Sequence, residues 1–471
     1  PYKKVLLSDL SVEQVIRFKE QESKLYGAQI DIGLVRNYPY KSLAAHALGY
    51  TQLITQNEFS ELSERGYKFS DRIGRKGIEA AFESELRGQW GGEMLEIDAM
   101  GTVQRSLGLK LPKAGKDIKL TLDLELQRTA EKVLSDKVGG AIVAIDPRTG
   151  AIRAIASQPT FDLNFFSQPF TNQQYDNLFV SLKRPLLSRA FNAYDPGSTW
   201  KPVTAIAGME SGKFPARQKL NTVPCITYGS HCFPEYNKRG FGWIGYEDAF
   251  RVSSNTFFYQ VGVGVGSKAL YDAAIKLGFD NYTGIETGFE ENKGLVGNKK
   301  WADQGRGWAN PGETPWIVED MASASIGQSV VLVTPLQLAR AYAVFANGGY
   351  LVTPHLVDGN RNWRSEKYLQ KVDINEKTLD TIRRGLRKVV TSGTGIGINI
   401  DTSNFPSVAG KTGTAEDISG GMDHAWFACF APYDSGEIVI VAFVQNTPGG
   451  GSVHALPMAR AILKTWSELQ S

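Results

Sequence analysis

Four short apolar runs constrain the fold of this chain more than any other feature. Residues 141–146 (AIVAID) and 151–157 (AIRAIAS) have the composition of β-strands and are joined by the turn sequence PRTG. Residues 425–431 and 437–445 form a second pair near the end of the chain. Because helical periodicity fills the region between the pairs, we expect a central antiparallel sheet flanked by helices, an α+β fold.

The helical signals are apolar residues spaced three or four positions apart. They predict helices over residues 199–211, 267–277, 335–347 and 376–390, and a last helix over residues 457–469. Gly262, Gly264 and Gly266 interrupt this periodicity, and they predict a loop.

The first part of the chain has a different organisation. It mixes polar helical stretches with short strands, predicted at residues 30–35 and 94–99, and holds no cluster of chemically active side chains. An amphipathic helix within residues 126–140 ends in paired glycines and marks a domain boundary. We therefore predict a non-catalytic domain over residues 1–135 and a second domain over residues 136–471.

Composition excludes several classes of protein. The chain has 471 residues, of which 42% are hydrophobic and 21% charged, which is typical of a globular protein with more than one core. Its 52 basic and 49 acidic residues give a net charge of only +3 without a basic run, so nucleic acid is not an expected partner. No stretch approaches the ~20 apolar residues of a membrane span, and residues 1–9 do not resemble a signal peptide.

The three cysteines are too few for a disulfide scaffold. Cys225 and Cys232 lie close together beside His231, and three interpretations stay open for them. An oxidising compartment would favour a disulfide, a zinc site would use both thiols with His231 and a nearby acid, and two free thiols are the third alternative. Cys429 lies in an apolar run and is expected to be a buried small side chain.

Ser198 and Lys201 form an S-x-x-K sequence at the start of a predicted helix, which places the hydroxyl and the amine on one face. A lysine can accept the proton of a serine nucleophile if burial or a nearby cation lowers its pKa. Taken alone the pattern is weak, because it also describes a solvated lysine on an ordinary helix.

Two further segments carry polar side chains that could act on a substrate. Ser253 and Asn255 could supply a hydroxyl relay and an amide, although a helix cap explains such a triplet equally well. Residues 411–414 (KTGT) could bind a carboxylate beside a glycine that lets a substrate approach the backbone, and their ordinary alternative is a strand end followed by a turn.

The order of the three segments is more specific than any one of them. S-x-x-K, S-x-N and K-T-G follow one another as they do in penicillin-recognising serine enzymes. A phosphate-binding loop at residues 410–412 is excluded, because Phe405 stands where that loop needs a glycine.

Over nearly its whole length the sequence resembles the class B penicillin-binding proteins. Besides the three motifs it contains RKGIE (75–79), ELRG (85–88) and TPLQL (334–338). HAWF (424–427) and FAP (430–432) are more similar to the elongation type of this family than to the division type. The resemblance implies a transpeptidase domain of β-lactamase-like fold that follows an N-terminal pedestal domain.

The resemblance also implies an activity, the cross-linking of peptidoglycan stem peptides that end in D-Ala-D-Ala. A serine attacks the penultimate D-Ala, the terminal D-Ala leaves, and an amine of a neighbouring stem resolves the acyl-enzyme. β-Lactam antibiotics would inhibit the enzyme by acylating the same serine. No metal or organic cofactor is implied.

The site residues follow motif by motif. The resemblance makes Ser198 the nucleophile, Lys201 the base, Ser253 the proton relay and Asn255 the residue that binds the amide of the acyl chain. It makes Lys411 the source of positive potential and places Thr412, Gly413 and Thr414 at the substrate carboxylate. The backbone N–H groups of Ser198 and Thr414 would form the oxyanion hole. We expect burial and the like charge of Lys411 to lower the pKa of Lys201 from its ordinary value of about 10.4.

The same resemblance implies a location and partners. It places the protein at the inner membrane through an anchor upstream of residue 1, with the catalytic domain on the periplasmic, extracytoplasmic side. The pedestal domain would bind a glycan polymerase of the SEDS type and other proteins of the elongation complex.

Two positions depart from the family pattern without touching a named site residue. Ser329 follows Gly327 and Gln328 where the family usually has Gly-Gln-Gly, and Cys429 stands where glycine is common.

Two other functions compete with transpeptidation. A β-lactamase or carboxypeptidase would use the same serine and lysine with water as the acceptor, but no glutamate can be assigned as a deacylating base and a β-lactamase has no use for the first domain. A non-enzymatic scaffold or an antibiotic sensor is the second alternative, and the intact motifs argue against the scaffold.

Overall fold

The computed structural model describes residues 7, 10–30, 35–100, 103–286, 288–307, 309–359, 365, 367–399, 405–416 and 422–470. The chain divides into two compact units, one of residues 1–117 with 160–186 and the other of residues 118–159 with 187–471. The domain boundary between residues 135 and 136 stays a prediction. The division into units shows in addition that residues 160–186 pack with the first part of the chain.

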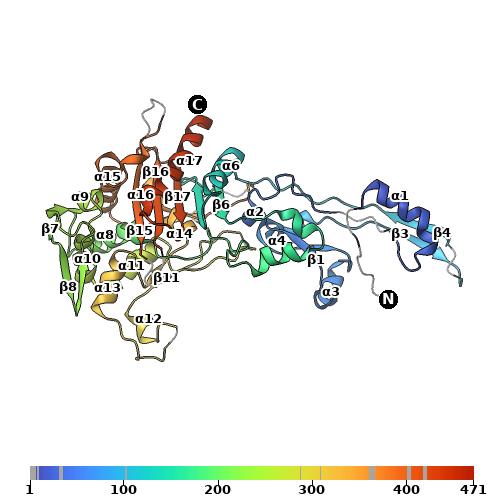
Figure 1. Ribbon diagram of the computed structural model, residues 1–471, viewed down its shortest axis with the longest axis horizontal. Helices are drawn as coiled ribbons and strands as arrows, with labels where there is room; N and C mark the ends of the chain where they lie inside the picture. The colour runs from blue at the N-terminus through green and yellow to red at the C-terminus, as the bar shows by residue number, and fades with distance from the viewer. Residues whose placement is uncertain are drawn as a thin grey trace. The chain divides into compact units, whose positions relative to one another are not determined.

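The second unit is built on a five-stranded antiparallel sheet in the order β15-β16-β17-β5-β6. The strands are β5 (Gly140–Ile145), β6 (Ile152–Gln158), β15 (Ala409–Ala415), β16 (His424–Ala431) and β17 (Ile438–Val444). Figure 1 shows the late strands beside the early ones, and the register pairs Val441 of β17 with Val143 of β5. The predicted sheet is confirmed, and β15, which carries the third motif, forms one of its edges.

Helices cover both faces of this sheet, as the complete burial of β17 requires. Helix α14 (Pro335–Ala346) packs on β5, β16 and β17, and α17 (Ala455–Gln470) packs on β16, β17 and α6 (Leu124–Leu134). Helix α15 (Glu376–Ser392) packs along the edge strand β15. The predicted helices in these regions are therefore confirmed.

The second unit also contains shorter helices and four two-stranded sheets. They are a 3₁₀ turn (Gly197–Trp200), α8 (Lys201–Glu210), α9 (Tyr246–Arg251), α10 (Asn255–Val265), α11 (Ser267–Lys276), α12 (Lys299–Asp303), α13 (Val318–Ser325), α16 (Gly450–Val453) and the strand pairs β7 (Lys219–Thr222) with β10 (Gly242–Gly245), β8 (Cys225–Tyr228) with β9 (His231–Pro234), β11 (Leu295–Val296) with β12 (Val331–Leu332) and β13 (Tyr350–Val352) with β14 (Leu369–Lys371).

The glycine-rich segment near residue 262 is helical, so the predicted loop is wrong. Gly262 and Gly264 lie inside α10, and Gly266 ends that helix with φ 83°. A Cβ atom on Gly262 would lie 1.8 Å from Oγ of Ser325, and one on Gly264 would lie 2.5 Å from the ring of Phe214. The first two glycines let neighbouring elements approach α10, which a sequence pattern cannot distinguish from chain breaking.

The first unit has a small aromatic core. Its buried side chains are Tyr38, Ala45, Tyr50, Phe161, Leu163, Phe166 and Leu178, so residues 160–186 complete a core that the earlier residues begin. The unit contains α1 (Val12–Gln21), α2 (Ala45–Leu48), β1 (Thr51–Leu53), α3 (Gln56–Leu62), β2 (Arg72–Gly74), α4 (Gly77–Ala81), α5 (Glu83–Leu86), β3 (Gly92–Ile97), β4 (Val103–Lys110) and α7 (Asn172–Tyr175).

Strands β3 and β4 form a hairpin in which every residue is exposed. The strand predicted at residues 94–99 is confirmed by β3, whereas most of the strand predicted at residues 30–35 lies outside the described residues. Among the helices that the structure describes, none combines the length and the apolar character needed to cross a bilayer.

Close packing at Gly262 predicts the effect of adding one methyl group. Gly262→Ala is expected to lower the free energy of unfolding by about 1–3 kcal/mol, because the methyl group would overlap Ser325. Urea unfolding of Gly108→Ala is the control, since a Cβ atom on Gly108 meets no atom within 4 Å. Equal stability of the two variants would contradict this account of the helix.

Candidate active site

Ser198 lies in the 3₁₀ turn that leads into α8, and Lys201 is the first residue of that helix. Side chains three residues apart eclipse one another in a 3₁₀ turn, so Ser198 and Lys201 project from the same side. Ser198 is half-buried, whereas Lys201 is fully buried. The local fold thus places a half-buried serine one turn before a fully buried lysine.

Three separate elements hold the backbone on both sides of Ser198. The indole N–H of Trp426, in β16, donates to the carbonyl of Asp195 at 2.9 Å. The hydroxyl of Tyr342, in α14, donates to the carbonyl of Thr199 at 3.1 Å, and the N–H of Gly197 donates to the carbonyl of Gly327 at 2.9 Å. The serine turn is therefore anchored to the sheet and to the helix that covers it.

The amines of Lys201 and Lys411 meet at the side chain of Ser253. Nζ of Lys201 donates to the carbonyl of Ser253 at 2.7 Å and to Oδ1 of Asn255 at 2.8 Å, and it lies 3.3 Å from Oγ of Ser253. Nζ of Lys411, in β15, donates to the same Oγ at 2.8 Å and to the carbonyl of Thr412 at 3.1 Å. Residues of all three motifs thus form one hydrogen-bond network.

Burial dominates the electrostatics of the two amines. It lowers the pKa of Lys201 to about 7, against the opposing effect of the nearby carboxylate of Glu235. Burial also lowers the pKa of Lys411 well below its ordinary range, and the charge of Lys201 lowers it further. The expected depression of the Lys201 pKa is thus present with burial as its cause, while the like-charge effect acts on Lys411.

A neutral Lys201 has a bonding pattern suited to accepting a proton. The carbonyl of Ser253 and Oδ1 of Asn255 only accept hydrogen bonds, so they occupy the two hydrogens of a neutral amine. The nitrogen lone pair is then left for a hydroxyl. None of these contacts is to Ser198, so proton transfer requires Oγ of Ser198 to come within hydrogen-bond reach of the amine.

Strand β15 packs directly against the serine turn. A Cβ atom on Gly413 would lie 2.9 Å from both the carbonyl oxygen of Pro196 and a methyl group of Thr199. Gly197, with φ 52°, faces the strand in the same way, because its Cβ atom would lie 2.4 Å from the carbonyl oxygen of Thr414. The glycine of the third motif therefore has a packing role, and substrate contact by Gly413 stays a prediction.

The two threonines of the third motif differ in exposure. Thr412 is buried, and its hydroxyl lies 2.8 Å from the hydroxyl of Thr394. Thr414 is exposed at the surface of the site. Their predicted binding of a carboxylate stays a prediction.

Family models match both parts of the chain. The model of the penicillin binding protein transpeptidase domain matches residues 140–464, and that of the penicillin-binding protein dimerisation domain matches residues 1–120. The chain belongs to the penicillin-binding protein transpeptidases. The family and the fold predicted from the sequence are thereby confirmed.

Similar proteins extend this relationship over almost the entire chain. The peptidoglycan D,D-transpeptidase MrdA of Acinetobacter baumannii is 32% identical, over 97% of this chain and 70% of that protein. Penicillin-binding protein 2 of Helicobacter pylori, in a complex with MreC, has a TM-score of 0.84 and 28% identity, over 96% of this chain and 83% of that one. A chain of a peptidoglycan synthase complex that coordinates polymerization and crosslinking has a TM-score of 0.81 and 30% identity, over 98% of this chain and 81% of that one.

The cysteine pair of this penicillin-binding protein forms a disulfide. Cys225 and Cys232 are bonded across the β8–β9 hairpin, with their Cα atoms 5.9 Å apart. Among the described residues no cluster of His, Cys, Asp and Glu could hold a metal ion. The disulfide is thus the interpretation that the structure supports. Cys429 is fully buried as predicted, and it faces Gly410 across the sheet.

The departure at Ser329 has a visible backbone consequence. Ser329 has φ 63°, in the left-handed region that glycine occupies without steric cost. The glycine expected there from the family pattern would suit this conformation, which serine adopts here.

Some residues around the site carry no sequence signal of their own. Glu235 is fully buried and bonds the second motif, although it belongs to no recognised motif. Gly450 and Gly451 pack on the third motif, because added Cβ atoms would lie 2.2 Å from Oγ1 of Thr414 and 2.5 Å from the carbonyl oxygen of Gly413. The glycine run at residues 449–451 is a signal that could have indicated this contact.

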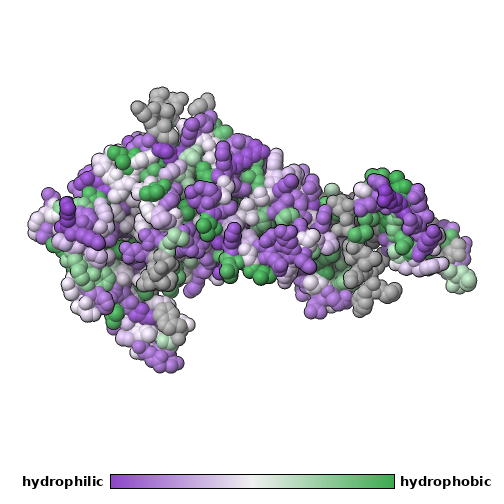
Figure 2. Space-filling model, viewed as in Figure 1, coloured by the Kyte–Doolittle hydropathy of each residue, from purple (hydrophilic) through white to green (hydrophobic). Residues whose placement is uncertain are grey.

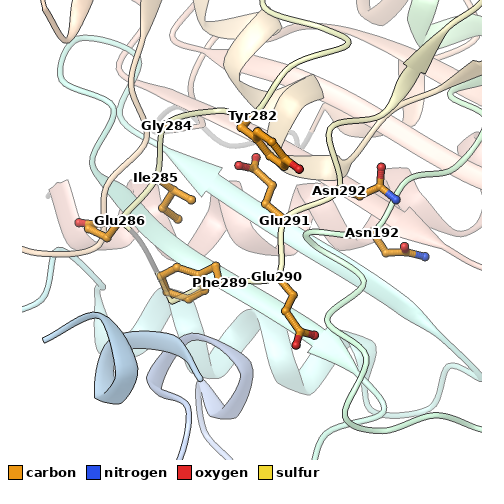
Figure 3. A pocket seen from close by; sticks show the side chains of 9 residues that line it. All are labelled: Asn192, Tyr282, Gly284, Ile285, Glu286, Phe289, Glu290, Glu291 and Asn292. Atoms are coloured by element: carbon orange, nitrogen blue, oxygen red, sulfur yellow. The ribbon is translucent and has the colours of Figure 1, made fainter. Parts of the chain in front are cut away.

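A cavity of about 610 Å³ lies apart from the motif residues of this penicillin-binding protein. Its lining includes Tyr282, Phe289 and the carboxylates of Glu286, Glu290 and Glu291 (Figure 3). Glu286 uses its carboxylate to accept the backbone N–H groups of Leu356 and Val357 at 2.9 and 3.0 Å. No residue of the three motifs lines the cavity.

The pKa of Lys201 predicts how acylation depends on pH. The base form accumulates as pH rises through about 7, so the rate of acylation by a penicillin should increase between pH 6 and 8 and then level off. Lys201→Arg keeps the charge but cannot act as a base, and should slow acylation by orders of magnitude.

Stopped-flow measurement of acylation, with thermal unfolding as the control for folding, tests both expectations. A Lys201→Arg variant that acylates at the parent rate would show that the proton goes elsewhere.

Proposed function

We propose that this protein is a peptidoglycan D,D-transpeptidase that cross-links stem peptides through an acyl-enzyme at Ser198 and is inhibited covalently by β-lactams. The observation that carries the proposal is the network in which Ser253 joins the buried amines of Lys201 and Lys411 beside the serine turn. The match to a transpeptidase domain supports the same conclusion.

The first step forms the acyl-enzyme. Neutral Lys201 takes the proton of Ser198, and Oγ attacks the carbonyl carbon of the penultimate D-Ala. The negative charge that develops on the carbonyl oxygen is met by the backbone N–H groups of Ser198 and Thr414. The close packing of Gly197 on the carbonyl of Thr414 supports this assignment, since it brings the turn and the strand together.

The C–N bond of the substrate then breaks, and the terminal D-Ala leaves as an amine. Its nitrogen takes a proton through the hydroxyl of Ser253, which the amines of Lys201 and Lys411 both contact. Asn255 holds the amide of the acyl chain, and Thr412, Gly413 and Thr414 bind the terminal carboxylate in the positive potential of Lys411.

The second half-reaction reverses these roles. An amine of a neighbouring stem gives a proton to the same network and attacks the ester carbonyl, which releases Ser198 and forms the cross-link. If water replaced the amine, the enzyme would be a D-Ala-D-Ala carboxypeptidase. Product analysis with an added acceptor amine distinguishes the two reactions.

The nucleophile is tested by locating a penicillin adduct. Incubation with a penicillin should add the mass of the intact drug to a peptide that contains Ser198, and Ser198→Ala should abolish the adduct. Peptide mass spectrometry locates the modified residue, while thermal unfolding checks that the variant folds. An adduct on Ser253, or one that persists in the variant, would refute the assignment.

We further propose that the N-terminal domain, predicted over residues 1–135, is a pedestal that binds proteins of the elongation machinery. Its partners would include a SEDS-type polymerase. The protein would be anchored in the inner membrane, with its catalytic domain in the periplasm. The relatives found with MreC and in a peptidoglycan synthase complex support partners of this kind.

The exposed hairpin of β3 and β4 supports an interaction through this domain. Leu107, Leu109 and Leu111 are 52%, 68% and 69% exposed, and they lie close together in the chain, two of them in β4 and the third directly after it. Figure 2 shows hydrophobic side chains gathered on the part of this unit that contains α1 and the hairpin. Exposed apolar side chains in such a group are typical of a protein interface.

A double substitution tests this surface in the full-length protein. Leu107→Asp with Leu109→Asp should abolish stimulation of a SEDS-type polymerase while leaving penicillin acylation unchanged. Ser106→Asp, at an exposed polar position of the same strand, is the matched control. Full stimulation by the double variant in a glycan-polymerisation assay would contradict the proposed surface.

A further inference from the structure

Glu235 is a buried carboxylate that no sequence motif explains. It follows strand β9 directly, and its own N–H donates to the carbonyl of Pro224 at 2.9 Å. The Cys225–Cys232 disulfide closes the hairpin that ends at this residue. Because a buried carboxylate is costly unless it is hydrogen-bonded, its partners indicate what it does.

The carboxylate of Glu235 accepts the backbone N–H of the next residue, Tyr236, at 3.1 Å, and its other hydrogen bonds come from the start of α10. Its oxygens accept the hydroxyl of Ser254 at 2.5 Å, the N–H of Asn255 at 2.7 Å, and the N–H and hydroxyl of Thr256 at 3.1 and 2.8 Å. Three successive residues are thus fixed by one side chain. The carboxylate also satisfies N–H groups that a helix N-terminus leaves without partners.

This anchoring reaches the residues that contact Lys201. Ser253 precedes the anchored residues and has φ 57°, a conformation that a serine keeps only when its surroundings impose it. Asn255 is held by its backbone while its side chain accepts from Lys201. A shift of α10 would therefore move both the carbonyl and the amide that orient the amine.

From these contacts we infer that Glu235 is a positioning residue for transpeptidation, which holds Ser253 and Asn255 against Lys201 and supplies a counter-charge to the amine of Lys201. The inference rests on the proposed acylation of Ser198. Glu235 does not touch the reacting atoms in this account, and it acts through the second motif.

The groups that face Lys201 set the expected pH response. They are Ser253 and Asn255, the amine of Lys411, the ring of Phe258 at 5.6 Å, and the charge of Glu235. Of these, the carboxylate raises the pKa of Lys201 against the effect of burial. Removing its charge should lower that pKa. The acid limb of the pH–rate profile, in which the acylation rate rises with pH, should therefore move to lower pH.

The test compares Glu235→Gln and Glu235→Asp with the parent protein. The amide of glutamine has one accepting oxygen and a donating NH2 group, so it cannot accept all the hydrogen bonds that the carboxylate accepts. Glu235→Gln should therefore lower the plateau rate of acylation about tenfold or more, and the rise of the rate with pH should begin at lower pH. Glu235→Asp keeps the charge, and it should restore the parent acid limb with a partial recovery of the plateau rate. Glu286→Gln, which alters another carboxylate that caps backbone N–H groups, should change neither.

Rates are measured with a fluorescent penicillin between pH 5.5 and 9 and expressed per active site by titration of the adduct. The inference would be overturned if Glu235→Gln had the same plateau rate and the same pH dependence as the parent protein. It would also be overturned if the variants contained less active protein but each active site reacted at the parent rate. If the parent protein itself forms no adduct at Ser198, the proposed function fails instead.

Discussion

The site depends on one hydroxyl shared by two buried amines. Oγ of Ser253 lies 2.8 Å from Nζ of Lys411 and 3.3 Å from Nζ of Lys201, and both lysines are fully buried. Two ammonium groups this close and this dry would repel each other and forgo their hydration, so the arrangement favours a neutral amine. The rest of the second unit can be understood as the support that keeps these three groups together.

That support comes from elements far apart in the sequence. Lys411 is on an edge strand whose place is set by pairing with β16, Lys201 begins a helix that the serine turn anchors to the same strand, and Ser253 precedes α10. The glycines at 197 and 413 allow the turn and the strand to meet without side chains between them. A larger residue at either position would separate the first motif from the third.

The sequence was sufficient for features that depend on local patterns. Short apolar runs and turn composition predicted the sheet, and the order of S-x-x-K, S-x-N and K-T-G predicted which residues would meet. It was insufficient where a tertiary contact decides the outcome. Gly262 resembles a chain break until Ser325 is seen beside it, and Glu235 is an ordinary glutamate until the fold carries it to α10. Burial was correctly expected to lower the Lys201 pKa, whereas the like-charge effect expected on Lys201 acts on Lys411 instead.

The return of residues 160–186 to the first unit changes how the two units are joined. The chain passes between them near residues 117, 159 and 186, so three covalent connections link what a simple two-domain chain links once. A protease that cuts one connection leaves the units attached through the other two. Cleavage between residues 117 and 118 alone would also leave Phe161 and Phe166 in the core of the first unit, still continuous with the catalytic chain. Separating the units as independent fragments therefore requires three cuts.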